Sequence, residues 1–368
     1  MSEYQYYEWL ALDRPLTDEE KAQVSRLSSH MDVVTSTQAV VTYHWSGFKH
    51  DPIDVLLRYF DAMLYWANWG SRRLAFRFPK GAIDTERIEA YWVDEWMALR
   101  ESGDYVALDI DVSEEEPPEF EVEPPDLGAL TRLRERIMEG DGRALYLVWL
   151  KAVEEMVLPE EEREPPLPPG LGALDGSLQA FADYFLDLDP LLLQAAAQAS
   201  APLQPEGDER LAAALAHLAP EECRAYLRRL LAGEPQVRSS LRKRLLELAG
   251  GPAQAPRQGT RTAAELLQRA EELRREERRR QEEARERKRR QRLDDLAAHE
   301  GEAWREVERL IEQKQSKAYQ QAVDRLKELR ELAQDRGTLP EFEARLAAVR
   351  AQYGGRPALM DLLKKAKL

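Results

Sequence analysis

The first third of the chain contains four stretches whose hydrophobic positions fit β-strands. In residues 73–78 and 105–112, hydrophobic and polar residues alternate, as in a strand with one buried face. Residues 4–12 and 33–45 are rich in aromatic and β-branched residues, and a proline follows the first of them closely. We therefore predict four strands within residues 1–113.

Helix-start signals separate these strands. Thr17–Glu20 matches a capping box and begins a short helix. Asp51-Pro52 supplies an N-cap and a proline for the first turn, and hydrophobic residues at helical spacing continue to Leu64. A further short helix is predicted at 88–99. The order favours an α+β domain with helices on one face of a small sheet, and a ferredoxin-like arrangement is one candidate.

Proline, glycine and acidic residues divide the middle of the chain. An acidic, proline-rich linker is predicted at 114–126 and a second linker at 250–261. Between them, residues 127–249 predict an irregular helical domain, because short helical patterns occur without a fixed-period repeat. It begins with a helical hairpin around Gly140–Gly142. The helices predicted after the hairpin are 178–186, 191–199, 209–217, 221–231 and 237–248.

The last third is predicted to be helical. Residues 262–299 contain neither Gly nor Pro and predict one long charged helix, in which Arg274–Arg292 offer no hydrophobic face. Glutamates that precede arginines by four residues favour this helix through ion pairs. In residues 301–368, prolines near helix starts and glycines after helix ends predict a C-terminal helical bundle.

Composition narrows the class of protein. The chain has 368 residues, of which 43% are hydrophobic and 33% charged, as in globular proteins of two or three domains. Its one cysteine, Cys223, excludes an intrachain disulfide. No hydrophobic run approaches the roughly 20 residues needed to cross a bilayer, and the N-terminus does not resemble a signal peptide. We therefore expect a cytoplasmic protein without membrane contact.

Charge is distributed unevenly, which bears on nucleic-acid binding. Residues 1–260 have a net charge of −20, whereas residues 261–368 have +5. Nucleic-acid contact is therefore expected, if anywhere, through residues 274–292. The candidate contacts are Arg285, Arg287, Lys288, Arg289, Arg290 and Arg292. Seven glutamates between Glu271 and Glu286 interrupt the positive charge, so we favour the interpretation of this helix as a solvated strut.

One group of residues is a candidate surface for a protein partner. Tryptophan and arginine are frequent at the energetic centres of interfaces, and both also stack on bases. The group consists of Trp66, Trp69, Arg72, Arg73 and Arg77. The alternative, which we favour, is that both tryptophans fill the core while the arginines cover the exposed face of a strand.

Motifs for catalysis or metal binding are not found in the sequence. The five histidines lie on separate predicted elements, and the nearest cluster, His44, His50, Asp51 and Asp54, includes a residue already assigned as a helix cap. Cys223 has no neighbouring base in the sequence to activate its thiol. We expect no metal and no cofactor, and we predict no catalytic residue.

Several segments resemble an uncharacterised family of bacterial proteins along nearly the whole chain. They are SEYQYYEWLALDRPLT, WANWGSRRL, GDGRALYLVWL, AYQQAVDRLKELRELAQDRG and RPALMDLLKKAKL. The tail, residues 304–368, also resembles helical segments that accompany SWIM-type zinc fingers. Those fingers need a Cys-x-Cys and a Cys-x-His pair, which a chain with only Cys223 cannot supply. The resemblance implies a helical accessory region and no ligand or catalytic residue.

These observations favour a non-enzymatic interaction or scaffold protein with a protein partner. A nucleic-acid-associated accessory protein that uses the basic C-terminal third is the alternative. An enzyme whose site is assembled from dispersed acids and His44 is the third hypothesis, because a fold class alone does not decide function.

Overall fold

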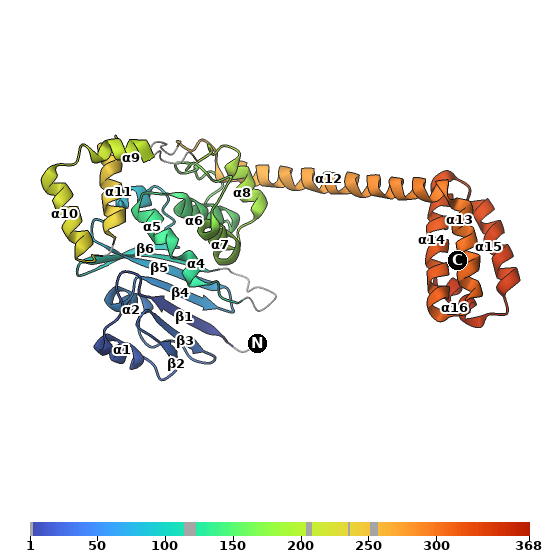
Figure 1. Ribbon diagram of the computed structural model, residues 1–368, viewed down its shortest axis with the longest axis horizontal. Coiled ribbons are helices and arrows are strands. Elements are labelled where there is room, and N and C mark those ends of the chain that lie inside the picture. The colour runs from blue at the N-terminus through green and yellow to red at the C-terminus, as the bar shows by residue number, and fades with distance from the viewer. Residues whose placement is uncertain (1–2, 114–122, 204–207, 235, 251–256) are drawn as a thin grey trace. The chain divides into compact units, whose positions relative to one another are not determined.

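The chain has an α+β N-terminal part and a mainly helical remainder, as predicted (Figure 1). It forms two compact units, unit 1 (Met1–Arg274) and unit 2 (Arg275–Leu368), each described separately below. The computed structural model describes residues 3–113, 123–203, 208–234, 236–250 and 257–368. Of the two predicted linkers, residues 114–122 and 251–256 lie outside the described residues.

Unit 1 is built around an antiparallel sheet of seven strands in the order β2-β3-β1-β4-β5-β7-β6. On β5 and β7, Leu74 lies opposite Ile110 and Phe76 opposite Leu108, so the hydrophobic residues of both strands share one face. This register confirms the alternation predicted from the sequence. The strands are β1 (Gln5–Leu10), β2 (Met31–Val34), β3 (Gln38–Tyr43), β4 (Ala62–Ala67), β5 (Ser71–Pro79), β6 (Met97–Ser102) and β7 (Tyr105–Ser113).

Helices cover both faces of the sheet, which corrects the expectation of helices on one face. On one face, α1 (Asp18–Ser25) and α2 (Pro52–Tyr59) enclose a core that contains Trp9 and Met63. Leu64 belongs to the core on the other face, which the later helices of unit 1 cover. Figure 1 shows α2 and α5 on opposite sides of the strands. The central strands are hydrophobic on both faces and therefore need both layers.

Two strands lie where the sequence predicted helix. α2 ends at Tyr59, and the hydrophobic residues that follow form β4 between β1 and β5. β6 overlaps the helix predicted at 88–99, where the observed helix is α3 (Thr85–Glu89). The hydrophobic run that forms β4 has no period that distinguishes a buried helix from a central strand. Pairing decided both segments, with β1 and β5 for β4 and with β7 for the edge strand β6.

Most helices between the sheet and α12 share one hydrophobic core with the sheet. The segments predicted as an α+β domain and as a helical domain therefore share one core, to which α4 to α8 contribute. α9, α10 and α11 contribute to a smaller hydrophobic cluster. The elements are α4 (Leu127–Leu130), α5 (Arg132–Met138), α6 (Arg143–Glu154), α7 (Gly176–Ala180), the π-helix η1 (Phe181–Leu186), α8 (Pro190–Ala197), α9 (Asp208–Leu215), α10 (Pro220–Leu231) and α11 (Val237–Leu248).

The predicted charged helix is α12 (Ala263–Ala298), a continuous helix of 36 residues. Its first turns contribute Leu266 and Leu273 to the core of unit 1, whereas every residue of 277–288 is exposed. Two of the predicted ion pairs are present, Glu286–Arg290 at 3.4 Å and Glu276–Arg280 at 4.0 Å. The exposed middle of α12 confirms that this stretch has no hydrophobic face to bury.

Unit 2 has a hydrophobic core of its own. Trp304, Leu326, Leu346 and Leu359 are among its buried residues. The helix that carries Leu326 ends at Gly337, whose φ of 71° is the left-handed conformation that glycine adopts without strain. The helices are α13 (Glu300–Glu312), α14 (Ser316–Arg336), α15 (Leu339–Tyr353) and α16 (Pro357–Lys365).

Candidate functional site

Trp66 and Arg72, two of the five residues predicted as a partner surface, face the interior of unit 1. They lie opposite each other on β4 and β5, with the Arg72 guanidinium 4.7 Å from the centre of the Trp66 ring. Both side chains are buried, and Arg72 Nη1 donates to the carbonyl of Phe185 at 3.1 Å. The pair therefore joins the sheet to η1 and does not present itself to a partner.

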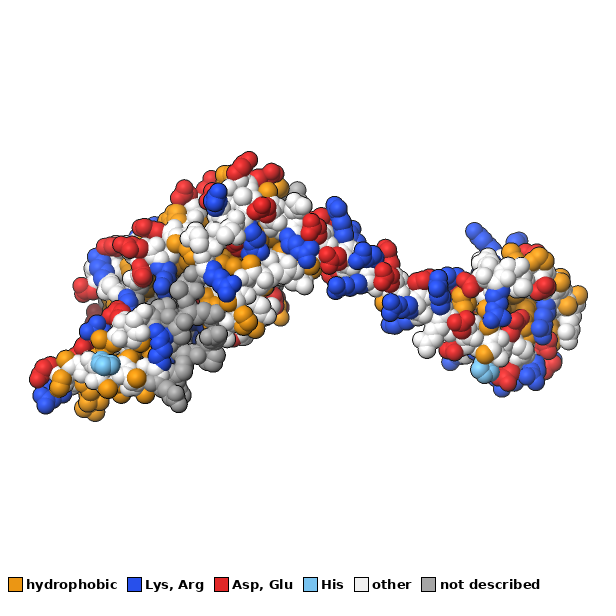
Figure 2. Space-filling model, turned by 90° about the horizontal axis from the view of Figure 1, so that it is seen from above, with side chains coloured by type: hydrophobic (Ala, Val, Ile, Leu, Met, Phe, Trp, Pro, Cys, Tyr) orange, Lys and Arg blue, Asp and Glu red, His pale blue; other side chains and the backbone are white. Residues whose placement is uncertain are grey.

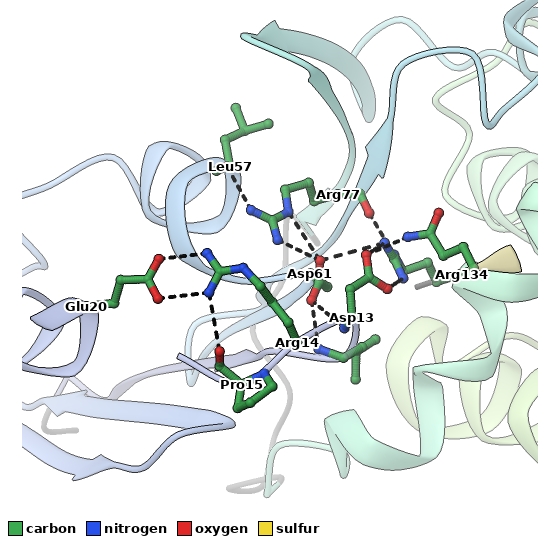
Figure 3. Close-up of polar contacts among 10 residues, drawn as sticks. Asp13, Arg14, Pro15, Glu20, Leu57, Asp61, Arg77 and Arg134 are labelled. Atoms are coloured by element: carbon green, nitrogen blue, oxygen red, sulfur yellow. Dashed lines mark hydrogen bonds and ion pairs between the residues drawn. The ribbon is translucent and has the colours of Figure 1, made fainter. Parts of the chain in front are cut away.

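Arg77 is also buried, in an ion-pair network between the sheet and α5 (Figure 3). Its Nη2 donates to Asp61 Oδ1 at 2.8 Å. Arg134 donates to both carboxylate oxygens of Asp13 at 2.8 Å and lies 3.7 Å from Asp61. Asp61 also accepts the backbone N–H of Leu12 at 2.7 Å. Four charged side chains from distant parts of the sequence thus meet in one buried network.

The charges in this network determine the protonation of Asp61. Burial raises the pKa of Asp61, but the opposite charges of Arg77 and Arg134 and the donated hydrogen bonds outweigh it and hold that pKa below its ordinary value. Asp61 is therefore ionised near neutral pH and has no proton to donate there. The network is suited to stabilising the packing of α5 on the sheet rather than to acid catalysis.

Trp69 and Arg73 lie nearer to solvent but do not form one surface with the other three. Trp69 is 36% exposed, and its Nε1 donates to Ser71 Oγ at 3.0 Å. Arg73 Nε donates to Asp109 Oδ1 at 2.7 Å, on the face of β5 opposite to Arg72. The four predicted residues on strands are thus divided between both faces of the sheet, and Trp69 lies in the turn between β4 and β5. Trp66 fills the core as expected, but Trp69 does not. Arg72 and Arg77 are buried rather than exposed.

A cavity of about 420 Å³ adjoins the Trp66–Arg72 pair. Two of the carboxylates that line it are engaged in local structure. Asp126 accepts the backbone N–H of Gly128 at 2.9 Å, and Asp183 accepts the side-chain amide of Gln179 at 2.8 Å. Asp126 therefore caps the start of α4, and Asp183 pairs with a residue one turn earlier on its helix. Neither carboxylate supports the enzyme hypothesis as part of an acid–base pair.

The six cations predicted for nucleic-acid contact lie in two environments on α12. Arg289 Nε donates to Glu331 of α14 at 2.8 Å, and Arg292 pairs with the same carboxylate. Arg290 pairs with Glu286 on α12 itself. Figure 2 shows acidic and basic side chains interspersed along this helix. Acidic side chains thus neutralise three of the six cations. The other three are exposed, and they are Arg285, Arg287 and Lys288.

Three exposed large hydrophobic residues are grouped on α10, which was not among the surfaces predicted from the sequence. Leu227 is 54% exposed, Leu230 52% and Leu231 89%. Helical spacing places these three leucines and Cys223 along one side of α10, and we call this set the α10 face. Every residue of α10 is described, and none of them is buried. A helix with this pattern and no buried residue has an unpartnered hydrophobic side.

α11 packs along one border of the α10 face. Glu222 accepts a hydrogen bond from Arg244 at 2.7 Å, and the Tyr226 hydroxyl contacts the carbonyl of Ser240 at 3.5 Å. Arg224 and Arg228 border the α10 face on the side away from these contacts, because they follow its residues by one position on the helix. The sequence contained the hydrophobic pattern, but only the structure shows which side of the helix is covered.

The nearest cluster of possible metal ligands in the sequence, around His44, His50, Asp51 and Asp54, does not form a metal site in the structure. Asp51 serves as the cap of α2, with Oδ1 accepting the N–H of Ile53 at 2.8 Å, and it pairs with Arg100. Across the residues that the structure describes, no three His, Cys, Asp or Glu side chains are grouped to hold a metal ion. In the same described segments, no helix is both long and hydrophobic enough to cross a membrane.

Comparison with known proteins adds no assignment. Against protein-family models, curated proteins and solved structures, the chain shows no significant similarity.

Proposed function

We propose that the chain is a non-enzymatic interaction protein that binds a protein partner through the α10 face. One observation carries the proposal. Of the ten large hydrophobic residues that are exposed in the described chain, four lie within residues 215–231: Leu215 and the three leucines of the α10 face. Such a concentration marks interaction sites more often than scattered exposed residues do. With one cysteine and no disulfide to form within the chain, we place this function in the cytoplasm.

The physical basis is the cost of leaving leucine side chains in water. Full burial of a leucine side chain contributes about 1.5–3 kcal/mol relative to an exposed one. A partner that covers the α10 face would recover part of that free energy for each of three adjacent leucines. Residues at the centre of a contact, from which water is excluded, commonly dominate binding energy.

We expect the double variant Leu227→Glu/Leu231→Glu to lose this partner without unfolding. The full-length protein and the variant are used as baits in the same cell lysate, and bound proteins are compared by quantitative mass spectrometry. At least about tenfold less of a specific partner should be recovered with the variant, because two charges replace the centre of the hydrophobic contact. Circular dichroism checks that both baits are folded.

Met156→Glu is the matched control, because Met156 is 82% exposed and lies outside the α10 face. This control should retain the partner. Equal recovery with wild type and the Leu227→Glu/Leu231→Glu variant would show that the α10 face is not the binding surface.

We also keep a second proposal, an accessory protein that contacts nucleic acid through α12, because Arg285, Arg287 and Lys288 are exposed on that helix. Changing these three residues and Arg290 to Gln should weaken binding of the full-length protein to duplex DNA. The slope of log affinity against log salt should fall by about 0.9 for each phosphate that the variant no longer neutralises. Changing Lys314, Lys317, Arg336 and Arg350 to Gln is the control. Equal affinities and slopes for both variants would rule out α12 as the contact.

A further inference from the structure

We infer that the partner of the α10 face is an amphipathic helix whose hydrophobic stripe is bordered by Asp and Glu. This inference rests on the proposed function and adds the chemistry of the partner. It is carried by two features of α10 together, the length of the exposed stripe and the charge along its open border.

The stripe has the dimensions of a helix-binding surface. α10 has 12 residues and so is about 18 Å long at about 1.5 Å per residue. Cys223, Leu227 and Leu230 follow one another at intervals of four and three residues, and Leu231 widens the stripe toward its C-terminal end. A partner helix that lies along α10 with its own apolar residues at the same intervals would pack its ridges between these side chains.

The open border of the stripe is positively charged. Arg224 is 66% exposed on its side chain and lies 3.6 Å from Glu221, which is more exposed still, and Arg228 is exposed one turn further on. Charges on the covered side already have partners within unit 1, such as Glu222 with Arg244. The exposed charges next to the leucines on this border are thus the Arg224 guanidinium, which pairs with Glu221, and the Arg228 guanidinium. Together with Glu221 they leave a net positive charge, which carboxylates on the partner complement.

The same charges disfavour a second copy of this chain as the occupant. α11 covers one border of α10, so an antiparallel pair of α10 helices would bring the open borders of both copies together. Arg224 and Arg228 of one copy would then face the same two arginines of the other. Like charges placed opposite one another oppose the contact.

An anionic membrane is also disfavoured as the occupant. Residues 1–260 have a net charge of −20, which repels a surface that is itself extended and negative. A single partner helix is much smaller than a membrane. Salt screens its carboxylates from charges more than a Debye length away, so they interact mainly with the charges near α10, which include the two arginines.

The test uses two synthetic helical peptides as probes. Both have leucines at alternating intervals of three and four residues over about 20 residues, and they differ only in whether Glu or Lys borders the leucines. Binding to the full-length protein is measured by fluorescence anisotropy. We expect the Glu-bordered peptide to bind about tenfold more tightly than the Lys-bordered one.

Two variants and one control separate the claim about the arginines from the claim about the leucines. Arg224→Glu/Arg228→Glu should reverse the preference between the peptides, whereas Arg336→Glu/Arg350→Glu in unit 2 should leave it unchanged. Leu227→Glu/Leu231→Glu should weaken both peptides. If the leucine variant weakens both peptides but the arginine variant leaves the preference unaltered, the acidic-helix inference is overturned and the proposed function stands. If the leucine variant binds both peptides as wild type does, the proposed function itself fails.

Two further measurements address the other occupants. Light scattering after size exclusion measures the oligomeric state of the wild-type protein and of the Leu227→Glu/Leu231→Glu variant. A wild-type dimer that becomes a monomer in the variant would overturn the inference, because the occupant would then be a second copy. Vesicles of phosphatidylcholine and phosphatidylserine in equal parts would overturn it if they bound the wild-type protein but did not bind the same variant. We expect the wild-type protein to be a monomer that does not bind these vesicles.

Discussion

Replacing Arg77 with Met should lower the free energy of unfolding of unit 1 by about 3–5 kcal/mol, the usual cost of removing one partner from a buried ion pair. Arg77 and Asp61 are both buried, and the guanidinium supplies two donors to Asp61 Oδ1, at 2.8 and 3.2 Å. Methionine keeps the apolar stem but removes the charge and the donors. Asp61 would then retain its backbone hydrogen bonds and Arg134 as compensation, but lose its closest opposite charge.

The loss of stability should depend on pH. In the wild type the folded pKa of Asp61 is below the unfolded value of about 3.9, so ionised Asp61 stabilises the fold above that pH, and this contribution is lost as pH falls through the folded pKa. In the Arg77→Met variant, burial still raises the pKa of Asp61 while the largest opposing charge is gone. The difference in stability between the two proteins should therefore be greatest near neutral pH and narrow in acid.

Urea unfolding followed by tryptophan fluorescence measures this effect, because seven of the eight tryptophans lie in unit 1. Arg100→Met is the control, since it removes the same side chain from a partly exposed pair with Asp51 and should cost no more than about 1 kcal/mol. A cost for Arg77→Met that is no larger than that for Arg100→Met would contradict the account of the buried network.

Replacing Trp304 with Ala should destabilise unit 2 by about 3–5 kcal/mol, because it leaves a large cavity in a small core. Trp304 is 1% exposed, its ring centre lies 5.6 Å from that of Phe342, and the Arg345 guanidinium lies 4.6 Å from it. The core of unit 2 shares no residue with the cores of unit 1. Unit 1 should therefore keep its stability in this variant.

Hydrogen exchange read peptide by peptide distinguishes the two units. Amides of α14 and α15 should exchange faster in Trp304→Ala, while those of β4 and β5 should exchange as in the wild type. Trp45→Ala is the control, because Trp45 is 80% exposed and its loss should change stability by no more than about 0.5 kcal/mol. Faster exchange throughout the sheet of unit 1 would show that the units do not unfold independently.

Helix ends were the most predictable part of the fold. The capping box at Thr17–Glu20 forms as expected, with the Thr17 hydroxyl accepting the N–H of Glu20 and the Glu20 carboxylate accepting the N–H of Thr17. Asp51 likewise caps α2. These signals depend on side chains within three residues of the backbone groups that they satisfy, so they can be read from adjacent sequence.

The central strand β4 was not predictable by the same reasoning. Its sequence, Ala-Met-Leu-Tyr-Trp-Ala, follows α2 closely and continues the helical spacing of hydrophobic residues. The segment is a strand because β1 and β5 satisfy its backbone on both sides and because both faces of the sheet are covered. Those partners are distant in sequence, and no local pattern specifies them.

The candidate sites were predicted only in part for a similar reason. The exposed cations on the middle of α12 follow from a stretch without hydrophobic residues, which local sequence shows directly. The burial of Arg72 and Arg77 depends on η1, α2 and α5 packing over the strand that carries them. The α10 face was missed because a hydrophobic stripe on a helix ordinarily predicts burial, and here no other element of the described chain covers it.

The amino-acid sequence by itself determined the succession of an α+β part and a helical remainder, the limits of most helices, and the solvated middle of α12. These properties depend on interactions between residues only a few positions apart. Tertiary structure alone decided the order of the strands, the burial of the Asp61–Arg77–Arg134 network and the exposure of the α10 face. Each of these depends on which distant segments come together, and the free energy that selects them comes from packing and desolvation across the whole unit.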